Sequence, residues 1–197
     1  MPNRLDDTAA KQLFTEARTH NMWQPKDVPD SLLTQVVDLM KMGPTSANCS
    51  PARILFVKSA AAKQRLAPFL SENNRPKTME APVCAIIGHD LHFYEHLPRL
   101  FPHNLTARSW FEGKADHIAT TALRNGSLQG AYLMLAARTL GLDVGAMSGF
   151  DNAGVDREFF PDQTVKSNFL CNLGYGDPAG LFARSPRFEF SEIAMVL

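Results

Sequence analysis

Residues 41–53 read Lys41-Met42-Gly43-Pro44-Thr45-Ser46-Ala47-Asn48-Cys49-Ser50-Pro51-Ala52-Arg53 and continue directly into the apolar run 54–57. An apolar pattern at helical spacing precedes them, and the run that follows is short and typical of a strand. Because proline fixes φ and lacks a backbone donor, Pro44 and Pro51 restrain the segment at both ends. The pattern predicts a stiff loop between a helix and a strand, which we call the site loop (residues 44–51).

Short polar side chains follow one another in the site loop. Thr45, Ser46 and Asn48 offer donors and acceptors of the kind that hydrogen-bond the edge of a flat polar heterocycle. A plain helix-stop loop is the alternative, since Pro, Ser and Asn are ordinary turn residues. Cys49 is a weak candidate nucleophile because no base lies near it in the sequence.

The bulk composition suits one globular domain over residues 1–197. Apolar residues make up 45% of the chain, and 20 basic residues balance 20 acidic ones. A net charge of zero provides no overall field to attract nucleic acid or an anionic membrane, so any anion must be recognised locally. No apolar run approaches the ~20 residues of a membrane span, and the N-terminus lacks a signal-peptide pattern. The three cysteines read as reduced thiols, so we expect a cytoplasmic protein.

Helical and strand patterns alternate without a repeat or a linker, which predicts an α+β domain. The patterns predict helices at Asp7–Arg18, at Asp30–Met42 with Asp30-Ser31 as its cap, at Ala60–Leu70, at Asp116–Leu140 and near Asn152–Phe160. They predict strands at Arg53–Lys58, Val83–His89, Leu142–Met147 and Lys166–Tyr175.

The longest periodic segment is Asp116–Leu140, and Gly141 is expected to end it as a C-terminal cap. Its apolar stripe at helical spacing consists of Ile118, Leu123, Leu128, Ala131, Tyr132, Leu135 and Leu140. Because this helix is apolar on several sides, we expect it to lie in the core of a dimer.

No regular pattern appears between His89 and Phe111, a stretch rich in aromatic residues that we call the aromatic segment (residues 89–111). Such a segment is either a plug over a core edge or a lid over a pocket. We favour the lid, because His103 and Arg108 are poorly suited to a plug.

Three other kinds of site are not expected. His89, His92 and His96 would share one helix face, but the helix would be short and no cysteine joins them, so we expect no metal site. The glycines at 174, 176 and 180 have the wrong spacing for a dinucleotide fingerprint, and too few residues follow them. No Gly-x-Ser-x-Gly occurs, which excludes a hydrolase nucleophile elbow.

Several segments, in order along the chain, resemble motifs of the nitroreductase family of FMN-dependent oxidoreductases. The site loop is similar to the family's Pro-Ser-x-x-Asn-x-Gln-Pro loop, and Ala17–Trp23 to its Arg-Arg-Ser-x-Arg-x-Phe entry motif. Asn74–Lys77 resembles the Asn-x-x-Lys flavin contact, and Ala146–Phe150 the turn that passes the reactive edge of the flavin. Residues 174–187 resemble the Gly-Tyr-Pro motif and the basic, phosphate-binding tail.

The resemblance implies a nitroreductase-like fold, with a central, mostly antiparallel sheet flanked by helices. It also implies an intertwined homodimer with the long central helix in the dimer core. In that family Thr45–Asn48 reach the flavin bound mainly by the other subunit, so the two sites are shared.

FMN contacts are implied at fifteen positions: Arg18, Thr19, Asn21, Pro44, Thr45, Ser46, Asn48, Asn74, Lys77, Ala146, Met147, Ser148, Gly149, Arg184 and Arg187. In this assignment the arginines hold the phosphate through their planar forks. Lys77 faces the side of the ring where negative charge develops, Asn74 is a rim donor, and Gly149 permits a close approach to N5. No side chain is implied to react covalently. Taken alone, these residues also fit a surface helix end, a plain turn and a solvated tail.

The chain departs from the family pattern in four places. Ala17 and Asn21 stand where the entry motif has its first and third arginines, which leaves the phosphate to Arg18 and the tail arginines, or FMN is held more weakly. Ser50 replaces a glutamine. Ser148 stands where many members carry glutamate, and the less acidic rim fits a substrate with a carboxylate.

The resemblance implies an oxidoreductase in which NADH or NADPH gives a hydride to flavin N5 and an acceptor then takes it. Residues 43–53 and 147–151 most resemble the malonic semialdehyde reductases of the family, which form 3-hydroxypropionate. The alternatives are a broad nitro or quinone reductase and a non-catalytic flavin-binding module.

A small acid aldehyde must be oriented through its carboxylate, so an arginine is expected to bind it. Our candidate is Arg108, with His103 and Trp110 beside it on the lid. Arg53 and Arg99 compete for this role, and a solvated lid charge is the alternative.

Overall fold

The computed structural model describes residues 4–197 and has a four-stranded sheet with strand order β1-β2-β4-β3. The strands are β1 (Ala52–Val57), β2 (Val83–Asp90), β3 (Asp143–Met147) and β4 (Val165–Gly174). All three pairings are antiparallel, so the mostly antiparallel sheet is confirmed. β2 is buried along its whole length because it lies inside the sheet with helices on both faces.

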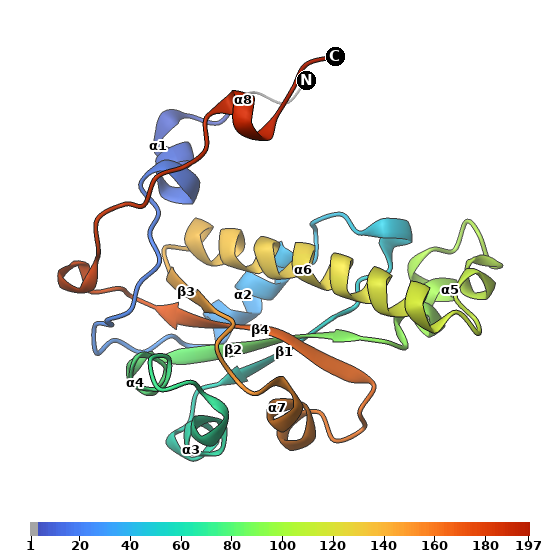
Figure 1. Ribbon diagram of the computed structural model, residues 1–197, viewed down its shortest axis with the longest axis horizontal. Coiled ribbons are helices and arrows are strands. Elements are labelled where there is room, and N and C mark those ends of the chain that lie inside the picture. Colours follow the sequence, from blue (N-terminus) through green and yellow to red (C-terminus); the bar gives the residue numbers. More distant parts are fainter. Residues whose placement is uncertain (1–3) are drawn as a thin grey trace.

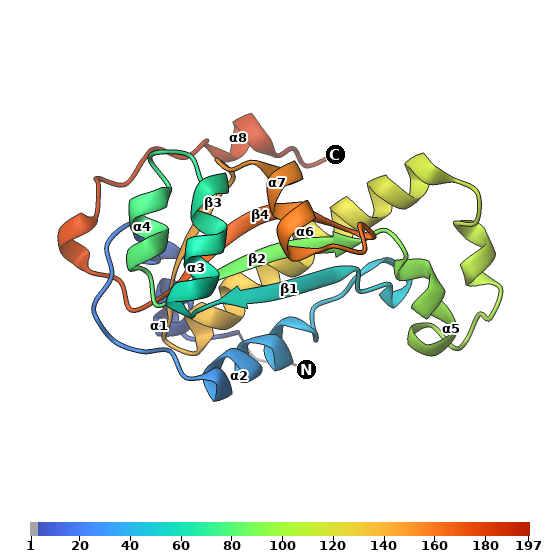
Figure 2. The same ribbon diagram turned by 90° about the horizontal axis from the view of Figure 1, so that it is seen from below.

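Helices cover both faces of the sheet (Figure 1 and Figure 2). One face carries α6 (Ala115–Thr139) and α2 (Asp30–Met40), and the other carries α3 (Ala60–Leu66), α4 (Arg75–Glu80) and α7 (Asn152–Phe159). Three shorter helices are α1 (Asp7–Ala10), α5 (Leu97–Leu100) and α8 (Phe190–Ile193).

Alternation along β2 produces two hydrophobic cores. Val83, Ala85 and Ile87 pack with α2 and α6, whereas Cys84 and Ile86 face the opposite core with α3 and α7. Successive residues of a strand point to opposite faces, so a strand covered on both sides is apolar throughout.

α6 meets the sheet through small and polar residues. A Cβ at Gly130 would lie 2.5 Å from the Phe169 ring, and one at Gly126 would lie 2.8 Å from His89 Cβ, so glycine is needed for this approach. Leu123 and Leu128 of the predicted apolar stripe are instead 47% and 41% exposed. The helix therefore has a second apolar surface that the sheet does not cover.

Most predicted elements are confirmed within a few residues, and Gly141, with φ of 79°, ends α6 as expected. The helix predicted at Asp7–Arg18 is wrong beyond Thr15. It consists of α1 and a π-helical turn at Lys11–Thr15, after which the chain extends and Thr19 pairs with Val144. Pairing at the sheet edge satisfies the backbone there and competes with the helix.

Two details at helix ends differ from the prediction. Pro29 occupies the N-cap of α2, without a side-chain cap, and the Asp30 carboxylate lies 3.1 Å from Lys58 Nζ instead. α3 ends at Leu66 and continues only as a 3₁₀ turn that contains Pro68, which lacks the donor that a longer α-helix needs.

The aromatic segment extends beyond the sheet, around α5 (Figure 1). Phe93, Leu97 and Phe111 are buried in a small separate core that includes Cys49 of the site loop. Its aromatic residues thus pack against one another and the site loop, and its role as a lid stays a prediction. Over residues 4–197, no group of three acidic, histidine or cysteine side chains is arranged to hold a metal. None of the helices in that range is long and apolar enough to cross a membrane.

Candidate functional site

A cavity of about 820 Å³ lies between the N-terminal segment, here residues 14–21, and the tail (residues 174–187). Four arginines line it: Arg18, Arg138, Arg184 and Arg187. No acidic residue lines the cavity, and none of the four forms an ion pair within residues 4–197. Clustered guanidinium groups without a counter-charge repel one another, so the cavity is suited to an anion.

Reciprocal hydrogen bonds hold the two walls of this cavity together. Arg18 Nη2 donates to the carbonyl of Phe182, and Arg184 Nη2 donates to the carbonyl of Ala17 at 3.1 Å. Arg187 Nη1 donates to the carbonyl of Ser185 at 2.9 Å, within the tail itself. The predicted phosphate-binding arginines are therefore brought together from the two ends of the chain.

Arg138 was not predicted from the sequence. It lies in the last turn of α6, is half-buried, and its Nη1 donates to the carbonyl of Leu13 at 2.9 Å. The available signal was a single arginine near the end of an otherwise apolar helical stretch.

The start of α4 is joined to residues 17–23, which we call the entry segment, and to the turn after β3. Lys77 Nζ donates to Asn21 Oδ1 at 3.2 Å, and the buried Asn74 donates through Nδ2 to the carbonyl of Gly149 at 2.9 Å. A Cβ at Gly149 would lie 2.8 Å from that same amide nitrogen, so the glycine is required by packing against Asn74. One N–H group of the Asn74 side chain is thus used to hold this turn in place.

The turn itself presents little charge. Ala146, Ser148 and Gly149 are exposed, whereas Met147 is buried and its Sδ accepts from Thr78 Oγ1 at 3.4 Å. Thr19 is exposed beside the same strand, where it bridges to Val144. Both views place α4 and the tail at the same end of the sheet (Figure 1 and Figure 2).

The site loop has a strained backbone. Ala47, Asn48 and Ser50 have φ of 49°, 50° and 39°, in the left-handed region that non-glycine residues rarely adopt. Residues kept in such conformations cluster at functional sites, because the surrounding structure must hold them there. This backbone favours a functional loop over a plain helix stop.

Hydrogen bonds to the site loop and to the residue after it maintain this conformation. Two buried amides on α6, Asn125 and Gln129, accept from the backbone N–H groups of Ser46 and Ala52, both at 2.8 Å. Three further bonds join Tyr132 Oη to the carbonyl of Pro44 at 2.9 Å, Ser50 N to Thr45 Oγ1 at 3.2 Å, and Asn48 Nδ2 to the carbonyl of Leu100 at 2.8 Å. Asn125 and Gln129 were also missed from the sequence, although two amides spaced four residues apart on an apolar helix are a signal.

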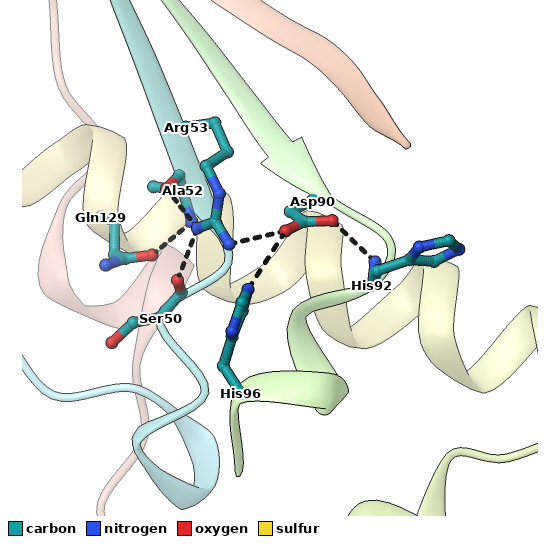
Figure 3. Close-up of polar contacts among 7 residues, drawn as sticks. All are labelled: Ser50, Ala52, Arg53, Asp90, His92, His96 and Gln129. Carbon is teal, nitrogen blue, oxygen red and sulfur yellow. Dashed lines mark hydrogen bonds and ion pairs between the residues drawn. The ribbon is translucent and has the colours of Figure 1, made fainter. Parts of the chain in front are cut away.

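Arg53 anchors the end of the site loop (Figure 3). Its Nη2 lies 2.6 Å from Asp90 Oδ2, while Nη1 donates to the carbonyls of Ser50 and Ala52 at 3.3 and 2.9 Å. Asp90 also accepts from the backbone of His92 at 2.7 Å. The Arg53 guanidinium is thus already paired with a carboxylate, so in this conformation it is poorly placed to bind the carboxylate of a substrate.

Arg108 is paired as well. Its Nε and Nη2 donate to the two oxygens of Glu95 at 2.7 and 2.8 Å, and its Nη1 contacts Glu112. The hydrogen bond from Arg108 lowers the pKa of Glu95. The other substrate candidates, His103, Trp110 and Arg99, are exposed on the same segment. For Arg108 to bind a substrate, these glutamates would have to release it.

The site loop and the arginine-lined cavity lie beside different parts of α6. Asn125, Gln129 and Tyr132 hold the site loop, whereas Arg138 lies at the arginine-lined cavity, 6 to 13 residues further along the helix. At 1.5 Å per residue this separation is about 9–20 Å along the helix axis. None of the site-loop residues 44–51 lines the arginine-lined cavity of the same chain.

The comparisons with known proteins decide the family. Residues 15–175 match the family model described as Nitroreductase family. The chain belongs to the nitroreductase family. A nitroreductase-family relative in Burkholderia lata is 65% identical over 98% of both chains, and one in Stenotrophomonas maltophilia is 60% identical over all of both. Both carry the provisional name NADH dehydrogenase/NAD(P)H nitroreductase.

Solved structures confirm the nitroreductase fold. A provisionally named nitroreductase of Bacillus subtilis superposes with a TM-score of 0.89 at 18% identity, covering 98% of this chain and all of that one. Another, from Exiguobacterium sibiricum and solved in complex with FMN, gives a TM-score of 0.83 at 20% identity, covering 100% of this chain and 99% of that one. The family match ends at Tyr175, before the tail arginines.

Proposed function

We propose that this nitroreductase-family chain binds FMN, with the phosphate in the arginine-lined cavity and the ring beside α4 and the turn after β3. The observation that carries the proposal is the cluster of arginines that lack a carboxylate partner. A phosphate monoester carries about −1.5 to −2 charge at pH 7 and accepts bidentate bonds from guanidinium groups. Arg18, Arg184 and Arg187, with Thr19, would hold it. The donor set therefore fits the group.

The chain's own residues would control the charge around the ring. When bound, FMN supplies the redox chemistry by taking up and releasing a hydride at N5. Lys77 would stabilise the negative charge of the reduced ring, and Asn21 keeps that ammonium in place. Asn74, buried and bonded to Gly149, would set the distance between the turn and the ring.

Two protomers would complete each site. No site-loop residue lines the cavity of its own chain, and the loop's contacts on α6 lie about 9–20 Å from Arg138 along the helix, which supports its serving the partner's site. The exposed apolar side chains that a dimer would cover are Leu123, Leu128, Phe182, Phe188, Phe190 and Ile193. We therefore propose a homodimer with two shared FMN sites.

For the reaction, we propose that NADH or NADPH is the electron donor and malonic semialdehyde the acceptor, which is reduced to 3-hydroxypropionate with a proton from solvent. The turn at 146–149 and the cavity lining carry no acidic side chain that would repel a carboxylate. A second candidate is a broad NAD(P)H nitro or quinone reductase, and the nitroreductase names of the Burkholderia and Stenotrophomonas relatives favour its nitro activity. The three buried, free cysteines support a reducing, cytoplasmic setting.

Anaerobic stopped-flow absorbance tests these proposals on the purified holoprotein. NADH or NADPH should bleach the flavin band, and malonic semialdehyde, a benzoquinone and a nitroaromatic are then compared as oxidants of the reduced protein. Fastest reoxidation by malonic semialdehyde supports the first acceptor, whereas faster reoxidation by the quinone or nitroaromatic overturns it in favour of the second candidate. A bound flavin that neither nucleotide bleaches would leave a non-catalytic flavin-binding module.

A further inference from the structure

Arg138 differs from the other three arginines of the cavity in the element that carries it. Arg18, Arg184 and Arg187 come from the chain ends, whereas Arg138 is carried by the long helix α6 that packs on the sheet. A guanidinium fixed on a helix is held more rigidly than one on a tail, and a rigid donor binds an anion at a lower entropic cost.

The donors of Arg138 are only partly used. Within residues 4–197, the carbonyl of Leu13 is the single hydrogen-bond acceptor for this guanidinium, and only Nη1 donates to it. Nε and Nη2 remain, and these two form the parallel fork that binds two oxygens of a phosphate.

Arg138 lies next to the entry segment. Together with Ala17 it lines both the main cavity and a neighbouring cavity of about 320 Å³, whose lining includes Asp143. Ala17 has no polar side chain to offer, so Arg138 is the one basic residue that lines both cavities within residues 4–197.

The half-buried guanidinium lacks full compensation. Burial lowers the pKa of Arg138, Cys171 and Asp143 oppose the shift, and the charge of Arg184 adds to it. Asp143 itself is engaged by His20 at 3.4 Å and by the backbone N–H of Gly176 at 2.9 Å. A bound anion would relieve this unfavourable balance.

We propose that Arg138 is a phosphate-binding residue of the FMN site, which supplies from α6 the cation that the entry segment lacks at Ala17. This inference rests on the proposed FMN site.

Comparison of FMN with riboflavin, which lacks the phosphate, isolates this role. Dissociation constants are measured by quenching of flavin fluorescence with the full-length apoprotein, for the wild type and Arg138→Met. The FMN constant should rise about 10- to 100-fold, as expected for loss of charge-assisted hydrogen bonds, while the riboflavin constant stays unchanged. The FMN dissociation constant of Arg138→Lys should lie between those of the wild type and Arg138→Met. Arg157→Met, an exposed arginine on α7, is the matched control and should change neither constant.

Other outcomes overturn the inference in separate ways. Equal weakening for both flavins would mean that Arg138 only supports the N-terminal segment through Leu13. An unchanged FMN constant would mean that it does not reach the phosphate. Wild-type protein that binds neither flavin would instead refute the proposed FMN site.

A second measurement remains available if Arg138→Met does not fold. Inorganic phosphate, compared with chloride at equal ionic strength, should raise the Tm of the wild-type apoprotein and should raise that of Arg138→Gln much less. Equal stabilisation of the two proteins by phosphate would contradict a role for Arg138 in anion binding.

Discussion

Arg53 Nη2 and Asp90 Oδ2 lie 2.6 Å apart where β1 and β2 meet the site loop (Figure 3). Because the same guanidinium donates to the carbonyl of Ser50, this ion pair connects the edge of the sheet to the strained part of the loop. The geometry of the site loop therefore depends on a charge pair that is mostly hidden from solvent.

Replacing Arg53 by Met should lower the free energy of unfolding by about 2–4 kcal/mol. The change leaves the Asp90 side chain, which is 9% exposed, without its guanidinium partner, and the imidazole of His96 remains beside it, at 4.0 Å. Arg65→Met is the matched control, since its pair with Glu158 is exposed and is worth at most about 1 kcal/mol. Urea denaturation measures both, and similar losses would show that Arg53 is only a surface charge.

Replacing Lys77 by Met should lower the flavin midpoint potential and slow reduction by NADH, because it removes the cation that we propose faces the reduced ring. Removal of one preorganised group of this kind typically costs on the order of 2.7–4 kcal/mol in the transition state. Spectroelectrochemistry and stopped-flow reduction measure the two effects. Lys41→Met, which removes an exposed cation paired with Asp38, should leave both unchanged. The assignment of Lys77 fails if the Lys77 variant matches this control.

Replacing Arg108 by Leu should reduce turnover of malonic semialdehyde much more than turnover of an uncharged quinone, provided that Arg108 leaves Glu95 and Glu112 to bind the carboxylate. Arg99→Leu is the matched control on the same segment. Equal losses with both acceptors would mean that Arg108 only holds the aromatic segment together. A selective loss in the Arg99 variant would move the role to that residue.

The chain should sediment as a flavin-loaded homodimer. The double change Leu123→Glu and Leu128→Glu places two charges on the uncovered apolar surface of α6 and should shift the species towards the monomer, with loss of FMN. Leu105→Glu, on an exposed leucine of the aromatic segment, is the control and should remain dimeric. A stable wild-type monomer that retains FMN would refute the shared site.

Alkaline pH should destabilise the fold partly through Cys49. Burial raises the pKa of this thiol from 9.0 to about 11, so between these pH values the unfolded chain loses the proton first. The unfolded state then binds fewer protons, and the free energy of unfolding falls as the pH rises, by up to about 1.4 kcal/mol per pH unit for this group. Denaturation from pH 7 to 11 should therefore give a shallower decline for Cys49→Ala than for the wild type. Parallel curves would exclude the effect.

Local patterns predicted most of the elements because their causes act within a few residues. The stretches that became β2, β4 and α6 have the apolar periodicity of buried strands and of a helix. The prediction failed where tertiary contacts compete with local preference. Beyond Thr15 the backbone pairs with β3 rather than continuing a helix, and the Asp30 carboxylate goes to Lys58 rather than to the end of its own helix.

The candidate site was predictable only in part. The motif-like segments pointed to Arg18, Lys77 and the tail arginines, which the structure places around one end of the sheet. The sequence did not point to Arg138 or to Asn125, because nothing in their immediate sequence distinguishes them from other polar residues on a long helix. Their surroundings come from segments distant in the sequence.

By itself, the sequence determined the kinds of element, the stiff proline-bounded loop and the chemistry available to the site, since these depend on local sterics and side-chain type. Only the tertiary structure decided which polar groups meet. Arg138 bonds to the carbonyl of Leu13 across 125 positions, and Arg184 bonds to that of Ala17 across 167. Such pairings follow from how the helices and the chain ends pack on the sheet, and no periodicity along the chain encodes them.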